Sequence, residues 1–174
     1  MHVLQYIAIK ASDEHAATQN VRMDLEDRED HWYDWFDEDG GRWSATEKPI
    51  SFAAEPQKFV DKFAWLMNQR QTELDDLVKR LGDTGYDLQD LILLYDPLKP
   101  LTTDKANALY GLTKIVKLLF MEWDYNSGFY DLENDSAAPF DVAEVINTCN
   151  TDTTTGVDSD DDETWWLVPV DFHF

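Results

Sequence analysis

The chain has 174 residues, of which 36 are acidic and 14 basic, so its formal net charge at pH 7 is −22. A charge of this sign and size opposes direct binding to DNA, RNA or an anionic membrane surface and favours a basic partner. No apolar run reaches the length of a membrane span, and residues 3–9 lack the features of a signal peptide. The single cysteine, Cys149, cannot form an internal disulfide, so we expect a cytoplasmic protein.

The N-terminal segment predicts a strand followed by a helix. Residues 2–10, HVLQYIAIK, are rich in branched and aromatic side chains and contain no breaker. Ser12 is the predicted N-cap of a helix whose first turn carries Asp13 and Glu14 and which continues to about Arg28.

The next segment predicts a turn and then a long helix. Gly40 and Gly41 mark the turn. From Phe59 to Leu81, apolar residues recur at steps of three and four, which predicts a helix ending before Gly82. Residues 86–95 form a shorter apolar segment that fits a helix better than a strand.

A second helix is predicted from Thr103 to about Phe120. Its expected buried stripe consists of Ala106, Leu109, Tyr110, Val116 and Leu119. Further on, residues 128–132 predict a short strand and residues 142–148 a helical turn or two.

The C-terminal segment predicts a mobile loop followed by a strand. Residues 148–164 are polar and acidic, with little apolar surface to offset their ordering entropy. Residues 164–174, TWWLVPVDFHF, predict a strand, and Pro169 inside it argues for an edge position or a bulge.

These elements predict one α+β domain covering residues 1–174. The sheet draws on the two chain ends and on the short strand at 128–132, while helices occupy the middle. We expect the first and last strands to be neighbours, because the apolar C-terminal strand otherwise leaves an exposed, aggregation-prone edge.

The acidic residues are unevenly distributed. Residues 58–117 contain nine acids and nine bases, so the excess lies in the flanks. Nine of the sixteen residues from 24 to 39 are acidic, opposed there by Arg28, and residues 152–163 add six acids and no base. A solvated surface or adaptation to high salt are alternative explanations, but a partner-facing acidic surface fits this concentration best.

The densest acidic segment also contains WYDWFDEDGGRW, residues 32–43, which combines five aromatic residues with four carboxylates. A loop pinned by its own aromatic side chains explains this composition. So does a binding site in which aromatic anchors supply burial and acids supply steering. Arg42 can stack on Trp43 or pair with the neighbouring acids. The predicted partner-binding residues are Asp24, Glu26, Asp27, Glu29, Asp30, Trp32, Tyr33, Asp34, Trp35, Asp37, Glu38 and Asp39.

Catalytic and metal-binding motifs were not found. The chain has no GxSxG, P-loop, HExxH, CxxC or GxGxxG segment, and the acidic run at 158–164 lacks the glycine and glutamate of an EF-hand. We therefore expect no metal and no cofactor. His2 and His173 lie on the two terminal strands and meet if those strands pair, and Asp171 shares a strand face with His173.

The pairing of WYDWFDEDGGRW with the terminal VPVDFHF resembles a group of small, uncharacterised acidic bacteriophage proteins. Those proteins carry a D-W-Y-x-x-G-G-R-W type segment near the N-terminus and a V-x-D-x-H type C-terminal strand. This chain departs from them by extra acids before the glycines and by Phe172 in place of a smaller residue. The resemblance implies a phage origin and, by similarity to small acidic phage inhibitors, a DNA-mimic-like anti-defence role.

The leading hypothesis is a non-enzymatic inhibitor acting in the host cytosol. It binds a basic, nucleic-acid-handling defence protein of the restriction or CRISPR nuclease class and blocks its nucleic-acid site. One alternative is an enzyme of unknown reaction that uses Arg42, Asp171 and His173. Another is an acidic structural or assembly protein of the virion. The partner's identity and the oligomeric state are left open.

Overall fold

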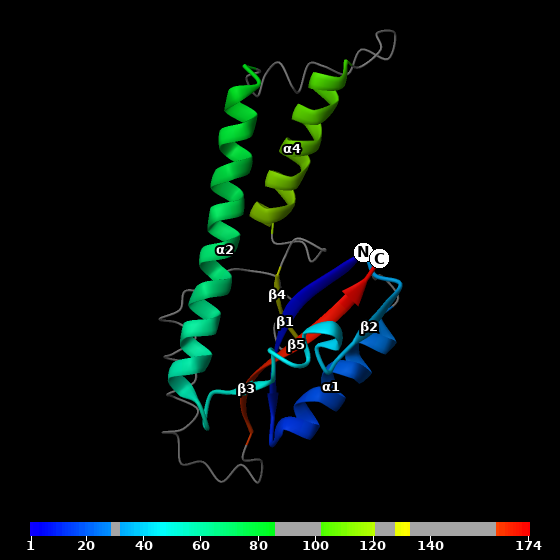
Figure 1. Ribbon diagram of the computed structural model, residues 1–174, viewed down its shortest axis with the longest axis vertical. Coiled ribbons are helices and arrows are strands. Elements are labelled where there is room, and N and C mark those ends of the chain that lie inside the picture. Colours follow the sequence, from blue (N-terminus) through cyan, green and yellow to red (C-terminus); the bar gives the residue numbers. More distant parts are fainter. Residues whose placement is uncertain (29–31, 86–101, 121–127, 133–162) are drawn as a thin grey trace.

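The computed structural model describes residues 1–28, 32–85, 102–120, 128–132 and 163–174. A twisted sheet lies between two helices, α1 (Glu14–Asp27) on one face and the first half of α2 (Pro56–Asp83) on the other, as Figure 1 shows. The second half of α2 extends beyond the sheet and packs against α4 (Thr103–Phe120). The arrangement confirms the predicted α+β fold.

The centre of the sheet is formed by the two ends of the chain. β1 (His2–Ala11) and β5 (Thr164–His173) are antiparallel and pair along their whole length, from His2 opposite His173 to Ala11 opposite Thr164. β4 (Phe129–Asp131) runs parallel to β1 on its other side. β2 (Trp35–Asp37) and β3 (Ile50–Ser51) pair with the far edge of β5. The predicted pairing of the terminal strands is therefore confirmed.

Both faces of the central strands are buried, which explains their nearly continuous apolar sequence. Ile7 and Val168 point toward α1, where they meet Val21. Tyr6 and Leu167 point the other way and pack with Phe59, Phe63 and Phe129 near α2. Full burial of one such aliphatic or aromatic side chain stabilises the fold by about 1.5–3 kcal/mol.

The N-cap of α1 is Asp13 and not the predicted Ser12. Asp13 has an extended backbone (φ −153°, ψ 173°), and its Oδ1 accepts a hydrogen bond from the backbone N–H of Ala16 at 2.8 Å. Both residue types cap well. Asp13 caps the helix because β1 continues to Ala11, so the chain turns one residue later than predicted.

The helix α2 is longer than predicted at both ends. It begins at Pro56, a residue whose fixed φ suits the first helical position, and it continues through Gly82 to Asp83. A glycine inside a helix costs about 1 kcal/mol relative to alanine, which a helix of this length tolerates.

The bounds predicted for α4 are confirmed, but the predicted buried stripe is wrong. Among its described side chains, those of Ala108 and Ile115 are buried, whereas Tyr110 is 58% and Val116 39% exposed, and Ala106 is exposed as well. Among the described elements, α4 packs against α2, where Ile115 lies with Leu77, and the two buried residues are seven positions apart on the helix. Leu109 is half-buried, and the side chain of Leu119 lies outside the described part of the structure.

The prediction that Pro169 marks an edge strand or a bulge is also wrong, because β5 is central. The N–H of Tyr6, opposite Pro169, donates to Gly128 at 3.0 Å, so this pair exchanges no backbone hydrogen bonds. The proline nitrogen thus points to the other edge of β5, between the positions paired with β3 and those paired with β2. Gly40 fills that gap, and a Cβ there would lie 3.6 Å from Pro169.

The strand predicted at 128–132 is confirmed as β4. The predictions for residues 86–95 and 142–148, and most of the loop predicted at 148–164, fall outside the described residues. Among the helices that the structure describes, none has the length and apolar character needed to cross a membrane.

Candidate functional site

The segment that carries the acidic and aromatic residues is held against the sheet by its own aromatic side chains. Tyr33 is buried, and its hydroxyl donates to the carbonyl of Leu25 in α1 at 2.9 Å. Burial raises the pKa of Tyr33 to about 12. Trp32 is half-buried against Phe172, and the N–H of Asp34 donates to the carbonyl of His173 at 2.7 Å. Two of the predicted anchors, Trp32 and Tyr33, are thus part of the core around α1.

Part of this segment, together with residues of α1, lines a shallow depression between α1 and β2, which we call the α1–β2 depression. Its volume is about 330 Å³. Trp35 is 46% exposed, and the side chains of Glu26 and Asp34 are 53% and 74% exposed. The lining residues are Arg22, Leu25, Glu26, Tyr33, Asp34, Trp35, Phe36 and Glu38.

Two arginines tie the acidic residues to the fold. Arg22 donates to Glu26 at 2.9 Å and to Glu38 at 3.2 Å, which shows that the α1 acids and the β2 acids lie side by side. Arg28 contacts Asp24 at 2.9 Å. It also donates to the hydroxyl of Tyr130 at 2.8 Å and lies 4.8 Å above that ring. Sequence analysis missed Arg22, although its four-residue spacing from Glu26 is a signal for this pairing.

The structure therefore divides the predicted partner-binding residues into groups. Those on the surface are Glu26, Asp27, Asp34, Trp35 and Asp39, while Asp24, Asp37 and Glu38 are partly exposed. Glu29 and Asp30 lie outside the described residues. We refer to the eight exposed and partly exposed residues as the acidic surface.

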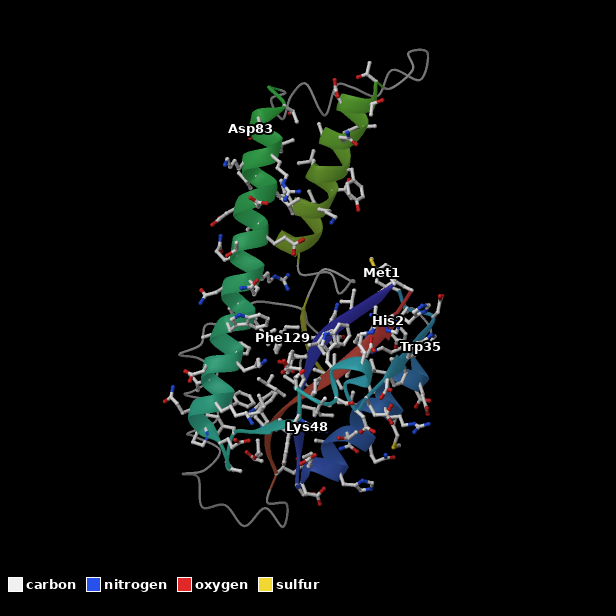
Figure 2. All side chains as sticks on the ribbon, in the orientation of Figure 1. Met1, His2, Trp35, Lys48, Asp83 and Phe129 are labelled. Atoms are coloured by element: carbon white, nitrogen blue, oxygen red, sulfur yellow. The ribbon has the colours of Figure 1, made fainter. Side chains whose placement is uncertain are left out.

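A second polar arrangement lies where the chain ends meet. His2 Nδ1 is 2.9 Å and 3.1 Å from the two carboxylate oxygens of the buried Asp171. One of those oxygens also accepts a hydrogen bond from the backbone N–H of Arg42 at 3.2 Å. Figure 2 shows His2 and Trp35 close together at this end of the sheet, near Met1.

A glycine is required for this arrangement. Gly41 has φ +48°, a left-handed conformation, and a Cβ there would lie 2.4 Å from Asp171 Oδ2. The turn around Gly40 and Gly41 thus brings the backbone of Arg42 within hydrogen-bonding reach of Asp171.

Asp171 and His173 share a strand face, but the imidazole that bonds to Asp171 is that of His2. In β2, Trp35 lies directly opposite His173, and the two rings stack at 5.1 Å with an interplanar angle of 13°. This stacking fixes the orientation of the His173 ring, and the carboxylate of Asp171 bonds to His2 instead. The His2 ring lies 5.0 Å from His173 and 5.5 Å from Trp35, so the three rings form one group. We call His2, Trp35, Asp171 and His173 the histidine cluster.

The three residues of the enzyme alternative are brought together in part. Arg42 reaches Asp171 through its backbone, whereas its guanidinium lies 5.7 Å above the ring of Trp43, which is one of the two arrangements expected for it. His2 was missed as a partner of Asp171. The sequence places His2 on the strand expected to pair with the C-terminal strand, but only the register of that pairing shows that His2 reaches Asp171.

A further polar network lies on the α2 side of the sheet. The hydroxyl of Tyr6 donates to Glu47, and Lys62 Nζ lies 3.0 Å from the same carboxylate oxygen and 4.8 Å above the Tyr6 ring. Burial alone raises the pKa of Glu47, but the hydrogen bonds from Tyr6 and Lys62 outweigh it, so the pKa is lowered overall. Burial and the Glu47 charge raise the pKa of Tyr6. This network anchors the 47–51 segment and α2.

Within the described ranges, no three His, Cys, Asp or Glu side chains are arranged to hold a metal ion. Comparison of the chain with protein-family models, with curated proteins and with solved structures found no match. The resemblance to phage proteins thus stays a prediction.

Proposed function

We propose that this chain is a non-enzymatic binding protein whose acidic surface occupies a basic, nucleic-acid-binding surface of another protein. The observation that carries this proposal is the convergence of Glu26, Asp34 and Glu38 on one depression beside an exposed Trp35. These residues come from two elements that the fold brings together, so the charge is concentrated in space as well as in sequence.

The chemistry of the acidic surface suits a partner rich in lysine and arginine. Carboxylates form charge-assisted hydrogen bonds with the same side chains that neutralise phosphates. The indole face of Trp35 attracts a cation, and tryptophan is among the residues that contribute most to binding. A basic side chain entering the α1–β2 depression finds both kinds of group.

The bridge through Arg22 prepares the acidic surface for binding. A single guanidinium holds Glu26 and Glu38 at a fixed separation, with the Glu38 side chain 18% exposed. Ordering these side chains before association reduces the entropy lost on binding. The net charge of −22 leaves the surface strongly acidic despite this one internal cation.

The test is a variant in which Asp34, Asp37, Glu38 and Asp39 are replaced by their amides. The replacement removes four charges with little change of shape. The matched control replaces the exposed residues Asp61, Asp75, Asp76 and Asp83 of α2 with asparagine, which removes the same charge elsewhere.

The binding partner for this test is the protein captured from a bacterial lysate at low salt and identified by mass spectrometry. We expect the four-amide variant to stay folded, to associate with the partner more slowly than the parent does, and to displace less nucleic acid from the partner. The parent's advantage should shrink as salt rises, because charges are screened within about 8 Å at physiological ionic strength. Equal displacement by the parent and both variants at every salt concentration would refute the proposal.

The class of partner we propose is a host defence nuclease of the restriction or CRISPR type. The support for this step is the resemblance of residues 32–43 and of the C-terminal strand to acidic phage proteins, together with the strongly negative charge. Capture of a nuclease whose cleavage this protein inhibits is the result expected. Capture of basic proteins without any effect on nuclease activity would limit the proposal to general binding of basic surfaces.

A second candidate function is favoured by the contact between His2 and Asp171. A buried carboxylate bonded to one imidazole nitrogen orients the other nitrogen for proton transfer, as in many acid–base enzymes. The two functions separate experimentally. An enzyme loses its activity in a His2→Gln variant and keeps it in the four-amide variant, whereas an acidic inhibitor shows the reverse pattern.

A further inference from the structure

The histidine cluster and the acidic surface share residues. His173 stacks on Trp35, and its Nδ1 lies 3.8 Å from Asp34 Oδ2. Trp35 and Asp34 also line the α1–β2 depression. The His173 imidazole therefore lies next to Trp35 and Asp34, two of the groups that the proposed function assigns to a basic partner.

With a neutral imidazole, His173 leaves Asp34 available. The distance of 3.8 Å is too long for a hydrogen bond, and His173 Nδ1 is shielded from solvent with no hydrogen-bond partner. The other imidazole, His2, is already bonded to Asp171. The side chain of Asp34 is 74% exposed and so faces the solvent from which a partner arrives.

With a protonated imidazole, the same geometry favours a different arrangement. A charged His173 attracts the Asp34 carboxylate, and its charge lies against the face of the Trp35 indole, where cations bind. A modest turn of the exposed Asp34 side chain is enough to close a hydrogen bond from 3.8 Å. Both groups then interact with a cation inside the molecule.

Other charged groups act on His173 from each neighbouring element. His2 of β1, whose ring lies 5.0 Å from that of His173, opposes a charge on His173 when it is itself protonated. The N-terminal ammonium, which contacts the Phe174 oxygen next to His173, also opposes that charge. Carboxylates favour the charge: Asp171 of β5, Asp37 opposite it in β2, and Asp34. Asp34 is the most exposed of these carboxylates, so it is the one placed to move.

We propose that His173 is a pH-dependent switch on the acidic surface. When its imidazole is protonated, His173 holds Asp34 and carries its charge against Trp35, and it so competes with a partner's lysine or arginine. When the imidazole is neutral, Asp34 and the exposed part of Trp35 are available to a partner. This inference rests on the proposed function, because the switch regulates that same site.

The switch itself is tested by NMR on the free protein. We expect the chemical shift of the Asp34 carboxylate carbon to show a pH-dependent transition in the parent, and this transition to vanish in His173→Gln. The control variant is His15→Gln, an exposed histidine of α1, which should leave the transition in place. Absence of the transition in the parent, or its survival in His173→Gln, overturns the switch.

The effect on binding is tested with a hexa-arginine peptide by calorimetry at constant ionic strength. If the charged form of His173 competes with the peptide, the parent's Kd should be several-fold higher at pH 5.5 than at pH 7.5. His173→Gln should lose this pH dependence, and His15→Gln should keep it.

The outcomes separate the switch from the proposed function. No binding of the peptide by the parent at either pH counts against the acidic surface as a site for basic side chains, while the NMR transition still decides whether the switch exists. Equal affinity of the parent at the two pH values, with binding present, overturns the switch and leaves the proposed function standing.

Discussion

The close approach of Gly41 to Asp171 provides a sharp test of how the chain ends are held together. Replacing Gly41 with alanine places a methyl group at a Cβ position 2.4 Å from Asp171 Oδ2 and 2.6 Å from Asp171 Cβ. Real Cβ atoms do not approach so closely, so the buried carboxylate has to move. Its hydrogen bonds to His2 and to the N–H of Arg42 are then lost or strained.

The cost has two parts. A left-handed conformation (φ +48°) costs a non-glycine residue about 1–2 kcal/mol. Disturbing a buried carboxylate that accepts two hydrogen bonds adds about 2–3 kcal/mol. We therefore expect the free energy of unfolding of Gly41→Ala to fall by about 3–5 kcal/mol, a large part of the stability of a small domain.

The matched control is Gly40→Ala. Gly40 also has a positive φ, +79°, but a Cβ there meets Pro169 at an ordinary distance of 3.6 Å. The free energy of unfolding of Gly40→Ala should therefore fall by about 1–2 kcal/mol, which is the cost of the left-handed backbone alone. Urea unfolding at 25 °C followed by tryptophan fluorescence measures both. Equal losses for the two variants would refute the reasoning, because they would show that the contact with Asp171 adds nothing.

Two further predictions concern stability. Glu47→Gln should cost about 1 kcal/mol at neutral pH by weakening the contact with Lys62. Because the pKa of Glu47 is lowered on folding, this stabilisation is fully present above the ordinary value of 4.5 and is lost as pH falls through the folded value, so the parent and the variant should converge in urea unfolding as the pH falls below 4.5. Deletion of residues 165–174 removes the strand that pairs with β1, β2 and β3, and should abolish the cooperative thermal transition seen by circular dichroism. A truncated protein that melts like the parent would contradict the central position of β5.

Sequence alone was sufficient for elements whose signals are local. The apolar, branched runs at both chain ends predicted β1 and β5, and the three- and four-residue spacing from Phe59 to Leu81 predicted α2. The pairing of the terminal strands also followed, because an apolar C-terminal strand needs a partner. These features depend on side-chain periodicity and on the requirement to bury apolar surface, and both can be inferred from a single sequence.

Sequence could not predict features that depend on register and on neighbours. Pro169 lies in a central strand because its nitrogen points to the gap between β3 and β2, which depends on where two short strands end. The buried line of α4 depends on how much of it α2 covers. In both cases a general rule was overridden by a tertiary arrangement with no local signal.

The same distinction applies to the candidate site. Sequence located the acidic segment, the aromatic residues within it, and Asp171 and His173 as polar residues of the last strand. The tertiary structure decided that Tyr33 is buried while Trp35 is exposed, and that Asp171 contacts His2. A hydrogen bond between residues far apart in the chain forms only if the two atoms are placed to within a few tenths of an ångström. The composition of a segment determines only which groups are present there.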